Sequence, residues 1–368
     1  MKRASIALTA LLSLVFGCGK SDLPVLKPIA QRAADAAPAP IPRAASPAVA
    51  SQPQSAPVTS VPPATVDKAL DELRALSAKL VERDPAGGWR ISEAAALELE
   101  KQVADADAKL LPLLADPSID VRRGAAFYLL GRFDPANKDH VAAFSRLLED
   151  ADQTVRGIGL SAVKQMRESD VAAAAPRLVT MLDPAREPQA ENRAAIARML
   201  GKLKLQAASA TGALIEAAAN DPAPQVRGVC LVAISQIATP EESVAAYRTA
   251  LTDADAAVRL VAAVRLRQLG PAAVAARQEL GKALEDQDER VSNAAAETLV
   301  QIGPPAIAML VKSLDAKPPT ARKLALACLA KLGPAAKEAI PAIEIRLKDD
   351  EAEVRKLAKI ALARIQGK

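Results

Sequence analysis

The chain has 368 residues, of which 50% are hydrophobic, but it contains only four Phe, two Tyr, one Trp, three Cys and one His. Because strands favour β-branched and aromatic side chains, this composition excludes a β-sandwich or barrel and favours closely packed helices rich in alanine and leucine. The formal net charge is +5, yet residues 66–368 carry 42 basic and 41 acidic residues, so no global field attracts nucleic acid.

The first 18 residues have the pattern of an export signal. Two basic residues, at positions 2 and 3, precede an apolar run over residues 4–16, which is too short to span a bilayer and is typical of a signal peptide. The run ends in Leu-Val-Phe-Gly-Cys at residues 14–18, which resembles the lipobox of bacterial lipoproteins. The resemblance implies that residues 1–17 are removed and that Cys18 carries acyl chains such as palmitate. An ordinary secretory signal with a chance cysteine is the alternative.

An extended tether is expected after the anchor. Residues 20–65 contain 10 Pro and 12 Ala but no Gly and no aromatic residue, a composition that cannot bury enough surface to fold. We therefore expect residues 18–65 to be a disordered tether that holds the folded part away from the membrane. Position 19 is Gly rather than the Asp associated with retention at the inner membrane. The lipoprotein resemblance thus implies the outer membrane, facing the periplasm.

Two capping helices are expected over residues 66–105. Apolar residues at helical spacing predict a first helix that ends near Arg83, and Ser92 is placed to cap a second helix that runs through Leu99 to Val103. Asp84, Pro85 and two glycines separate the two helices. Trp89 lies in the same interval, where we expect it to plug the open end of the core.

From residue 106 onward the chain repeats at intervals of 30–37 residues, which predicts a solenoid. The repeats align on a Val-Arg pair or its equivalent at Val121, Val155, Asn192, Val226, Val258, Val291, Ala321 and Val354. An aspartate stands five residues before this position in six copies, while Asp183 stands nine before it in the third copy and Asp315 six before it in the seventh. A small or short residue stands four residues after the aligned position, and an aliphatic residue stands eight after it. This pattern predicts a closely packed inner helix face.

The turn aspartate, the Val-Arg pair and the trailing leucine together resemble HEAT and HEAT-like repeats over residues 106–366. The resemblance implies an all-α fold, an α-solenoid or superhelix of about eight HEAT-like helix pairs over residues 106–368. It also implies a ladder of ion pairs between neighbouring repeats, made by Asp116, Arg122, Asp150, Arg156, Asp221, Arg227, Asp253, Arg259, Asp349 and Arg355. Ser292 replaces arginine in the sixth copy, where we expect a weaker ladder, and the long third turn over residues 184–191 is the expected local specialisation.

No catalytic constellation is found in the sequence, and we expect no cofactor, no metal and no small-molecule substrate. The carboxylates stand mostly at repeat turns, where helix capping and the ladder explain them. Cys230 and Cys328 are expected to be buried and too far apart for a disulfide, and His140 is expected to be a solvated side chain.

The sequence favours a non-enzymatic, membrane-tethered scaffold that presents the concave face of the solenoid to a protein partner. The alternative is a HEAT-like enzyme or cofactor handler, because such repeats also resemble those of bilin lyases and of an alkylpurine DNA glycosylase family. Outward positions of the second helices predict a basic and apolar stripe; solvated helix residues with no partner would give the same pattern. The candidate partner-binding residues are Arg123, Phe127, Lys164, Arg198, Val232, Val264, Arg267, Lys323 and Lys356.

Overall fold

The computed structural model describes residues 63–83, 89–103 and 105–367. These residues belong to one compact unit that extends from Val61 to Lys368. The predicted signal peptide over residues 1–17, the acylation site Cys18 and residues 18–62 of the predicted tether lie outside the described residues. The last three residues of the predicted tether are already helical, because helix α2 covers Pro63–Ala78.

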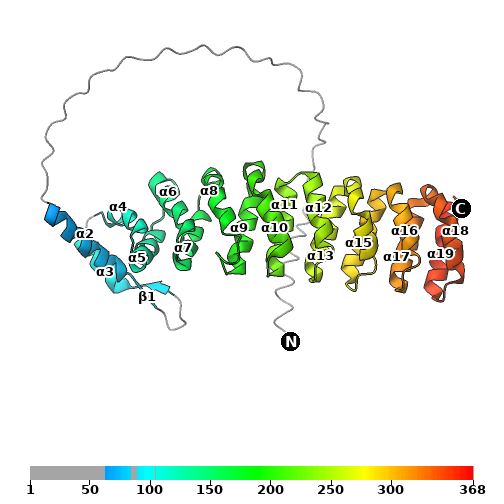
Figure 1. Cartoon of the computed structure of the whole chain (residues 1–368), viewed down its shortest axis with the longest axis horizontal. Coiled ribbons are helices and arrows are strands. Elements are labelled where there is room, and N and C mark those ends of the chain that lie inside the picture. The colour runs from blue at the N-terminus through cyan, green and yellow to red at the C-terminus, as the bar shows by residue number, and fades with distance from the viewer. Residues whose placement is uncertain (1–62, 84–88, 104, 368) are drawn as a thin grey trace, which may run out of the picture. The chain divides into compact units, whose positions relative to one another are not determined.

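Paired helices stack side by side in chain order, as Figure 1 shows for the part coloured from cyan to red. Each pair has a first helix, which is often short and continued by a 3-10 turn, and a longer second helix. The first helices are α4 (Ala106–Leu110), α6 (Lys138–Arg146), α8 (Glu168–Thr180), α10 (Thr211–Asn220), α12 (Pro240–Ala250), α14 (Arg277–Ala283), α16 (Ile307–Ser313) and α18 (Ile340–Ile345). The second helices are α5 (Ile119–Leu130), α7 (Gln153–Val163), α9 (Ala190–Lys202), α11 (Pro224–Ile237), α13 (Ala256–Leu269), α15 (Glu289–Ile302), α17 (Pro319–Leu332) and α19 (Ala352–Ile365).

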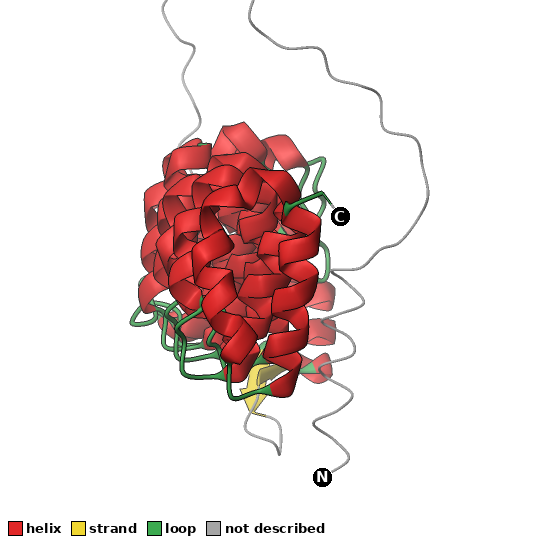
Figure 2. Ribbon diagram, turned by 90° about the vertical axis from the view of Figure 1, so that its right-hand side faces the viewer, coloured by secondary structure: helices red, strands yellow, loops and turns green. Residues whose placement is uncertain are grey.

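The predicted all-α solenoid of helix pairs is therefore confirmed. Viewed from the end of the stack, the helices superimpose and the loops gather at their edges (Figure 2). Glycine ends three of the second helices, since Gly270, Gly303 and Gly333 have φ values of 56°, 80° and 57°. Only glycine adopts this backbone region without strain, and the proline that follows each of them suits the first turn of the next helix.

Alanine and leucine fill the core between the layers. At the position four residues after the aligned one, Ala125, Ala262 and Ala295 are fully buried, and Leu129 and Leu266 are fully buried one turn later. Small side chains at the first of these positions allow neighbouring helices to approach closely. The repeat pattern thus places the same two buried rows in each layer, except that Leu362 of the last layer is half-buried.

The N-terminal region departs from the predicted pair of capping helices. Helix α2 ends at Ala78, and the residues that follow form a two-stranded antiparallel hairpin of β1 (Val81–Arg83) and β2 (Trp89–Ile91) before helix α3 (Glu93–Gln102). The predicted extension of the first helix to Arg83 is wrong. Val81, Trp89 and Ile91 favour strands, and the Ser92 amide donates a hydrogen bond to the Leu80 carbonyl at 2.8 Å, which fixes the hairpin against the end of α2.

The expectation that His140 is a solvated side chain is also wrong. His140 is buried, its Nδ1 accepts a hydrogen bond from the Asp134 amide at 3.2 Å, and its ring stacks on Phe133. Cys230 and Cys328 are buried free thiols, and burial raises the pKa of each to about 12. Within the described ranges, no helix is both long and apolar enough to cross a bilayer, and no cluster of His, Cys, Asp and Glu could hold a metal ion.

Candidate functional site

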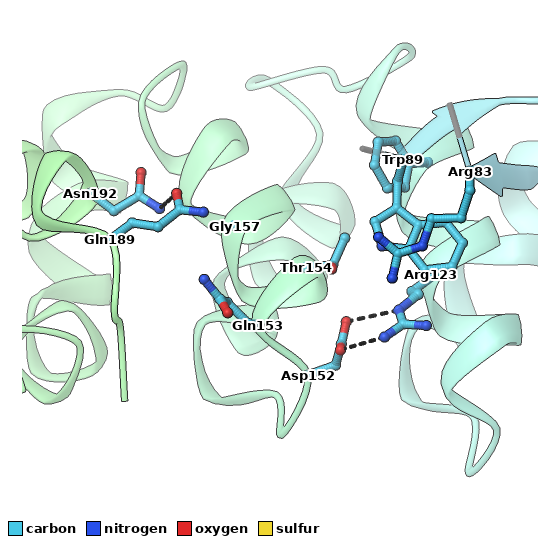
Figure 3. A pocket seen from close by; sticks show the side chains of 10 residues that line it. Arg83, Trp89, Arg123, Asp152, Gln153, Thr154, Gly157, Gln189 and Asn192 are labelled. Atoms are coloured by element: carbon cyan, nitrogen blue, oxygen red, sulfur yellow. Dashed lines mark hydrogen bonds and ion pairs between the residues drawn. The ribbon is translucent and has the colours of Figure 1, made fainter. Parts of the chain in front are cut away.

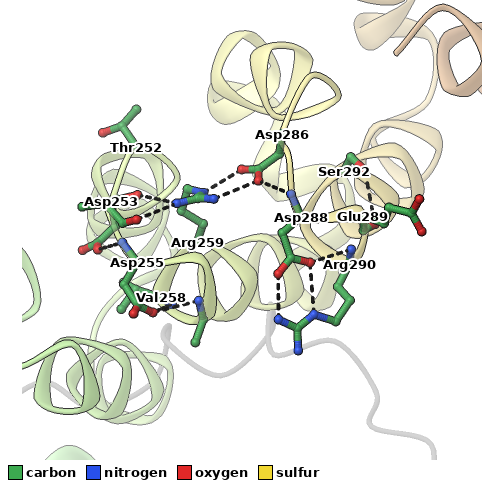
Figure 4. Close-up of polar contacts among 12 residues, drawn as sticks. Thr252, Asp253, Asp255, Val258, Arg259, Asp286, Asp288, Glu289, Arg290 and Ser292 are labelled. Carbon is green, nitrogen blue, oxygen red and sulfur yellow. Dashed lines mark hydrogen bonds and ion pairs between the residues drawn. The ribbon is translucent and has the colours of Figure 1, made fainter. Parts of the chain in front are cut away.

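A ladder of arginine–aspartate ion pairs joins successive second helices. In most rungs Nε and Nη2 of the arginine contact the two carboxylate oxygens of the next layer, while Nη1 donates to the backbone carbonyl six residues before the arginine. Figure 4 shows this arrangement for Arg259, which binds Asp286 at 2.6 and 2.9 Å and the Asp253 carbonyl at 2.8 Å. The rungs are Arg74–Asp116, Arg122–Asp150, Arg193–Asp221, Arg227–Asp253, Arg259–Asp286 and Arg322–Asp349. Each rung therefore ties one turn to the next layer.

Hydrogen bonds from the arginines and from backbone amides lower the pKa values of four rung carboxylates. Burial alone would raise the pKa of Asp253, but the Arg227 side chain and the Asp255 amide donate hydrogen bonds that hold it below the ordinary value. The pKa values of Asp116, Asp286 and Asp349 are lowered in the same way, because hydrogen bonds to each carboxylate outweigh the effect of its burial. Among the arginines that the structure describes, Arg193 is the most deeply buried, and its hydrogen bond with Asp221 raises its pKa.

The residue at the ladder turn stands six residues before the arginine whose Nη1 its carbonyl binds. This fixed spacing corrects two of the predicted turn positions. In the third copy, Glu187 stands six residues before Arg193, its carbonyl accepts from Arg193 Nη1 at 2.7 Å, and its carboxylate accepts from the Gln189 amide at 3.0 Å. Glu187 therefore occupies the ladder position that the sequence pattern assigned to Asp183. In the seventh copy, Ala316 occupies this position, because its carbonyl accepts from Arg322 Nη1 at 3.0 Å. Asp315 lies on the surface and pairs with Arg346 instead.

The ladder starts one layer earlier than predicted, at α2. Arg74 Nε contacts Asp116 at 2.6 Å, and the buried Ser77 hydroxyl donates to the Val121 carbonyl at 3.0 Å. A Cβ on Gly124 would lie 1.7 Å from the Ser77 carbonyl oxygen, so α2 and α5 can approach this closely only with glycine there. Leu73, Arg74 and Ser77 have the spacing of the Val-Arg pair and its small residue, with leucine in place of valine, which is the signal that could have revealed this layer.

Two junctions in the described stack have no rung, and they differ. Between α15 and α17 both partners are replaced, since Ser292 donates to its own helix at the Glu289 carbonyl and the partner position is Ala316. Between α7 and α9 both partners are kept but do not pair. Arg156 instead donates to carbonyls of Asp150, Ala151 and Arg186.

The unpaired junction leaves two buried polar atoms unsatisfied. Arg156 Nε and Glu187 Oε2 have no hydrogen-bond partner within the described chain. Glu187 is fully buried and Arg156 is 7% exposed. Among successive second helices, α7 and α9 also pack together least closely. The long third turn therefore coincides with a discontinuity in the solenoid.

An open groove of about 460 Å³ crosses this discontinuity (Figure 3). It extends from the hairpin over the middle of α5 and the N-terminal half of α7 to the start of α9. We call it the Trp89 groove, and it is lined by Arg83, Trp89, Arg123, Phe127, Asp152, Gln153, Thr154, Gly157, Gln189 and Asn192.

Trp89 forms the aromatic wall of this groove. The ring is half-buried, with the guanidinium of Arg83 at 4.0 Å and that of Arg123 at 4.7 Å from its centroid. Arg123 also contacts both carboxylate oxygens of Asp152, at 3.0 and 2.7 Å. The expectation that Trp89 plugs the end of the core is therefore wrong, since the ring faces the groove between two cations.

The structure brings only Arg123 and Phe127 of the predicted stripe together in one site. Lys164, Arg198 and Lys356 are exposed in separate layers, and Lys323, Val232 and Val264 are half-buried. Three of the six cations pair with acids, as Arg123 does with Asp152, Arg267 with Glu297 and Lys356 with Glu353. The stripe is therefore less basic than the sequence pattern indicated, because Asp152 and Glu353, which pair with two of its cations, are not themselves part of the predicted stripe.

Residues 244–330 match the family of HEAT repeats. This part of the chain consists of HEAT repeats. Among solved structures, the chain is similar to importin beta, with 15% identity and a TM-score of 0.48 over 82% of this chain and 47% of that chain. It is also similar to YibA of E. coli, with 20% identity and a TM-score of 0.38 over 76% of this chain and 98% of that chain. A designed armadillo repeat protein is similar over 52% of this chain and 99% of its own, with 21% identity and a TM-score of 0.32.

The chain spans about half the length of importin beta. No curated protein matches the chain. The helical repeat solenoid described above is an architecture typical of protein-binding scaffolds, which use the extended surface along the stack.

Proposed function

We propose that this protein is a lipid-anchored, non-enzymatic scaffold of the bacterial cell envelope that binds a protein partner on the face formed by its second helices. The observation that carries the proposal is the Trp89 groove, where an aromatic ring, two arginines and several amide side chains meet on that face. Aromatic residues and arginine are enriched in protein interfaces because they combine large contact area with hydrogen bonding.

The anchor part of the proposal is supported by residues 2–18 and by the composition that follows. Acyl chains on Cys18 would hold the protein stably at a membrane. A tether of this length would reach up to roughly 140 Å if extended at ~3.1 Å per residue. Wild-type protein should fractionate with membranes, and Cys18→Ala should be soluble or remain as a precursor. Equal membrane association of the two forms would contradict the anchor.

The partner-binding part is tested by site-specific photocrosslinking in intact cells. Gly157 on α7 and Gly228 on α11 both stand two residues after the aligned valine, and an added Cβ at either would meet no described atom within 4 Å. A photoreactive side chain at position 157 should give a discrete protein adduct, whereas the same side chain at position 228, outside the groove, should not. The absence of adducts at 157 and at neighbouring groove positions would contradict binding on this face.

A further inference from the structure

We propose that the open face of α19 binds an acidic segment of a protein through the free guanidinium of Arg355. Helix α19 belongs to the last layer that the structure describes, at the red end of the stack in Figure 1. This contact lies in other layers than the Trp89 groove and goes beyond the function proposed above. The argument begins with Arg355, because it stands at the ladder position of its layer.

Arg355 is held in the orientation of a rung arginine. Its Nη1 donates to the carbonyls of Asp349 and Asp350 at 2.8 and 2.9 Å, just as Arg259 Nη1 donates to the carbonyls six and five residues before it. In Arg259, Nε and Nη2 then bind the two oxygens of the Asp286 carboxylate. In Arg355, Nε and Nη2 have no partner within the described chain. The predicted ladder role of Arg355 is therefore met only toward its own turn.

The rungs indicate which group this guanidinium accepts. The arginines that hold a carboxylate with both Nε and Nη2 are Arg74, Arg122, Arg193, Arg227 and Arg259. A planar guanidinium matches the two oxygens of a carboxylate, and one that is already oriented loses less entropy on binding. The acids near Arg355 do not compensate its charge, because Asp350 pairs with Arg322, Glu353 pairs with Lys356, and Glu351 forms no ion pair with it.

A second cation stands one turn after Arg355, five residues after the aligned position. This position faces the next layer, since the Ala263 carbonyl accepts from the Thr298 hydroxyl of α15. In the seven preceding layers it is buried and is Ala126, Leu160, Ala197, Leu231, Ala263, Ala296 or Leu326. In α19 it is Lys359, which is exposed. A further helix pair of the same kind would bury this ammonium group at a high cost, so an acidic occupant suits the face better than another layer.

Leu362 follows one turn later and adds an apolar contact. The aliphatic residues at this position are fully buried in the seven preceding layers, whereas Leu362 is half-buried. We call Arg355, Lys359 and Leu362 the α19 end face. Their helical spacing places neighbouring Cβ atoms about 6 Å apart, and alternate side chains on one side of an extended segment lie roughly 7 Å apart. A segment with two acids separated by one residue, and an apolar residue two positions from one of them, therefore matches the α19 end face.

A protein segment suits the α19 end face better than a nucleic acid. Asp350 and Glu353 stand close to Arg355 in the sequence, and their side chains are 92% and 58% exposed. These carboxylates would repel the closely spaced phosphates of a nucleic acid. Leu362 gains stability only against an apolar side chain, which a protein segment supplies.

The test is selection of a phage-displayed library of random 12-residue peptides on the full chain in detergent micelles, with counterselection on Arg355→Ala. The recovered peptides should carry the pattern of two acids and an apolar residue given above. A synthetic peptide of the enriched sequence should bind at least tenfold more weakly when its acids are replaced by their amides. Arg355→Lys keeps the charge but loses the planar fork, so it should weaken the same peptide at least tenfold. Arg364→Lys, at an exposed position of the same helix, should leave the affinity within twofold.

Circular dichroism of the two lysine variants controls for folding, and the amide peptides test the acids on the unaltered protein. Recovery of no peptide, of peptides without acids, or of peptides indifferent to Arg355→Lys would overturn the proposal. A single-stranded DNA of 20 nucleotides that bound at Arg355 more tightly than the peptide would also overturn it, because the end face would then be a phosphate site. The photocrosslinking test at position 157 is independent of these results, so the scaffold function can stand where this proposal fails.

Discussion

The ladder is interrupted at two junctions, and the two interruptions differ in what they leave behind. Between α15 and α17, serine and alanine replace both partners, and the helices pack closely. Between α7 and α9, Arg156 and Glu187 are both present and buried, each has an atom without a partner in the described chain, and the helices pack least closely. The α15–α17 junction has lost its rung and both charged partners with it. The α7–α9 junction keeps two buried charged groups that do not pair.

The two junctions differ in the free energy that the missing rung costs the folded protein. Replacing both partners of a buried hydrogen bond by apolar groups is nearly neutral, whereas a buried group without a partner costs about 1–3 kcal/mol. The α7–α9 junction therefore gives up stability in the same layers where the Trp89 groove lies. Such a local cost is expected where a surface serves binding rather than stability.

Acid should weaken four of the rungs together, and this is the largest expected effect. The rung carboxylates Asp116, Asp253, Asp286 and Asp349 have lowered pKa values in the folded protein. Their stabilisation is thus complete above the unfolded pKa of about 3.9 and is lost as pH falls through the folded pKa values. Urea unfolding between pH 7 and pH 2 should show a steep fall in the free energy of unfolding below about pH 4. Asp286→Ala should show a shallower fall, and a flat profile in the wild type would contradict the ladder energetics.

Arg193→Ala should be the most destabilising single substitution in the ladder. Arg193 and Asp221 are both almost completely buried, so removal of the arginine leaves an unpaired buried carboxylate and should cost about 3–5 kcal/mol. Ser292→Ala, at the junction without a rung, should change the free energy of unfolding by less than about 0.5 kcal/mol. Similar losses in the two variants, measured by chemical denaturation, would show that the rung does not set the stability of its junction.

Gly124→Ala should separate α2 from α5. The added Cβ would lie 1.7 Å from the Ser77 carbonyl, so the helices must move apart at a cost of about 1–3 kcal/mol. Gly228→Ala, at an open helix position, should instead stabilise the protein by roughly 0.5–1 kcal/mol. Thermal melts of the two variants should shift in opposite directions. A shift of both in the same direction would contradict the close packing of α2 as the first layer of the ladder.

Glu187→Gln should have a small effect, although Glu187 is fully buried. Its Oε2 has no hydrogen-bond partner within the described chain, so the substitution should change the free energy of unfolding by less than about 1 kcal/mol. Asp221→Asn removes the charge from a formed rung and should cost several-fold more. Equal costs in urea titrations would indicate that the α7–α9 rung is formed in solution.

The layers of the fold could be predicted from the sequence because their signals are local and recur. The turn acid, the Val-Arg pair and the trailing leucine each occupy fixed positions within one helix pair. Glu187 and Ala316 were missed because the alignment followed aspartate rather than the constant spacing of six residues to the arginine. Arg74 was missed because leucine replaces the valine before it.

The site was harder to predict than the layers. The Trp89 groove combines the hairpin, α5, α7 and α9, which lie far apart in the sequence and meet only in the folded stack. The charge of the predicted stripe was overestimated because Asp152, the partner of Arg123, belongs to the next layer. Pairing across layers depends on how the helices pack, and periodicity within one helix does not reveal it.

Native-state hydrogen exchange tests the central claim most directly. Amides of α7 and α9 should exchange through an opening of lower free energy than amides of α11 and α13, because the intact rung at Arg227–Asp253 and close packing hold the latter pair together. Amides of α15 and α17 should be protected like those of α11 and α13, although the α15–α17 junction has no rung, like the α7–α9 junction. Uniform protection along the stack, or the lowest protection at α15 and α17, would contradict the claim that α7 and α9 form the weak junction of the solenoid.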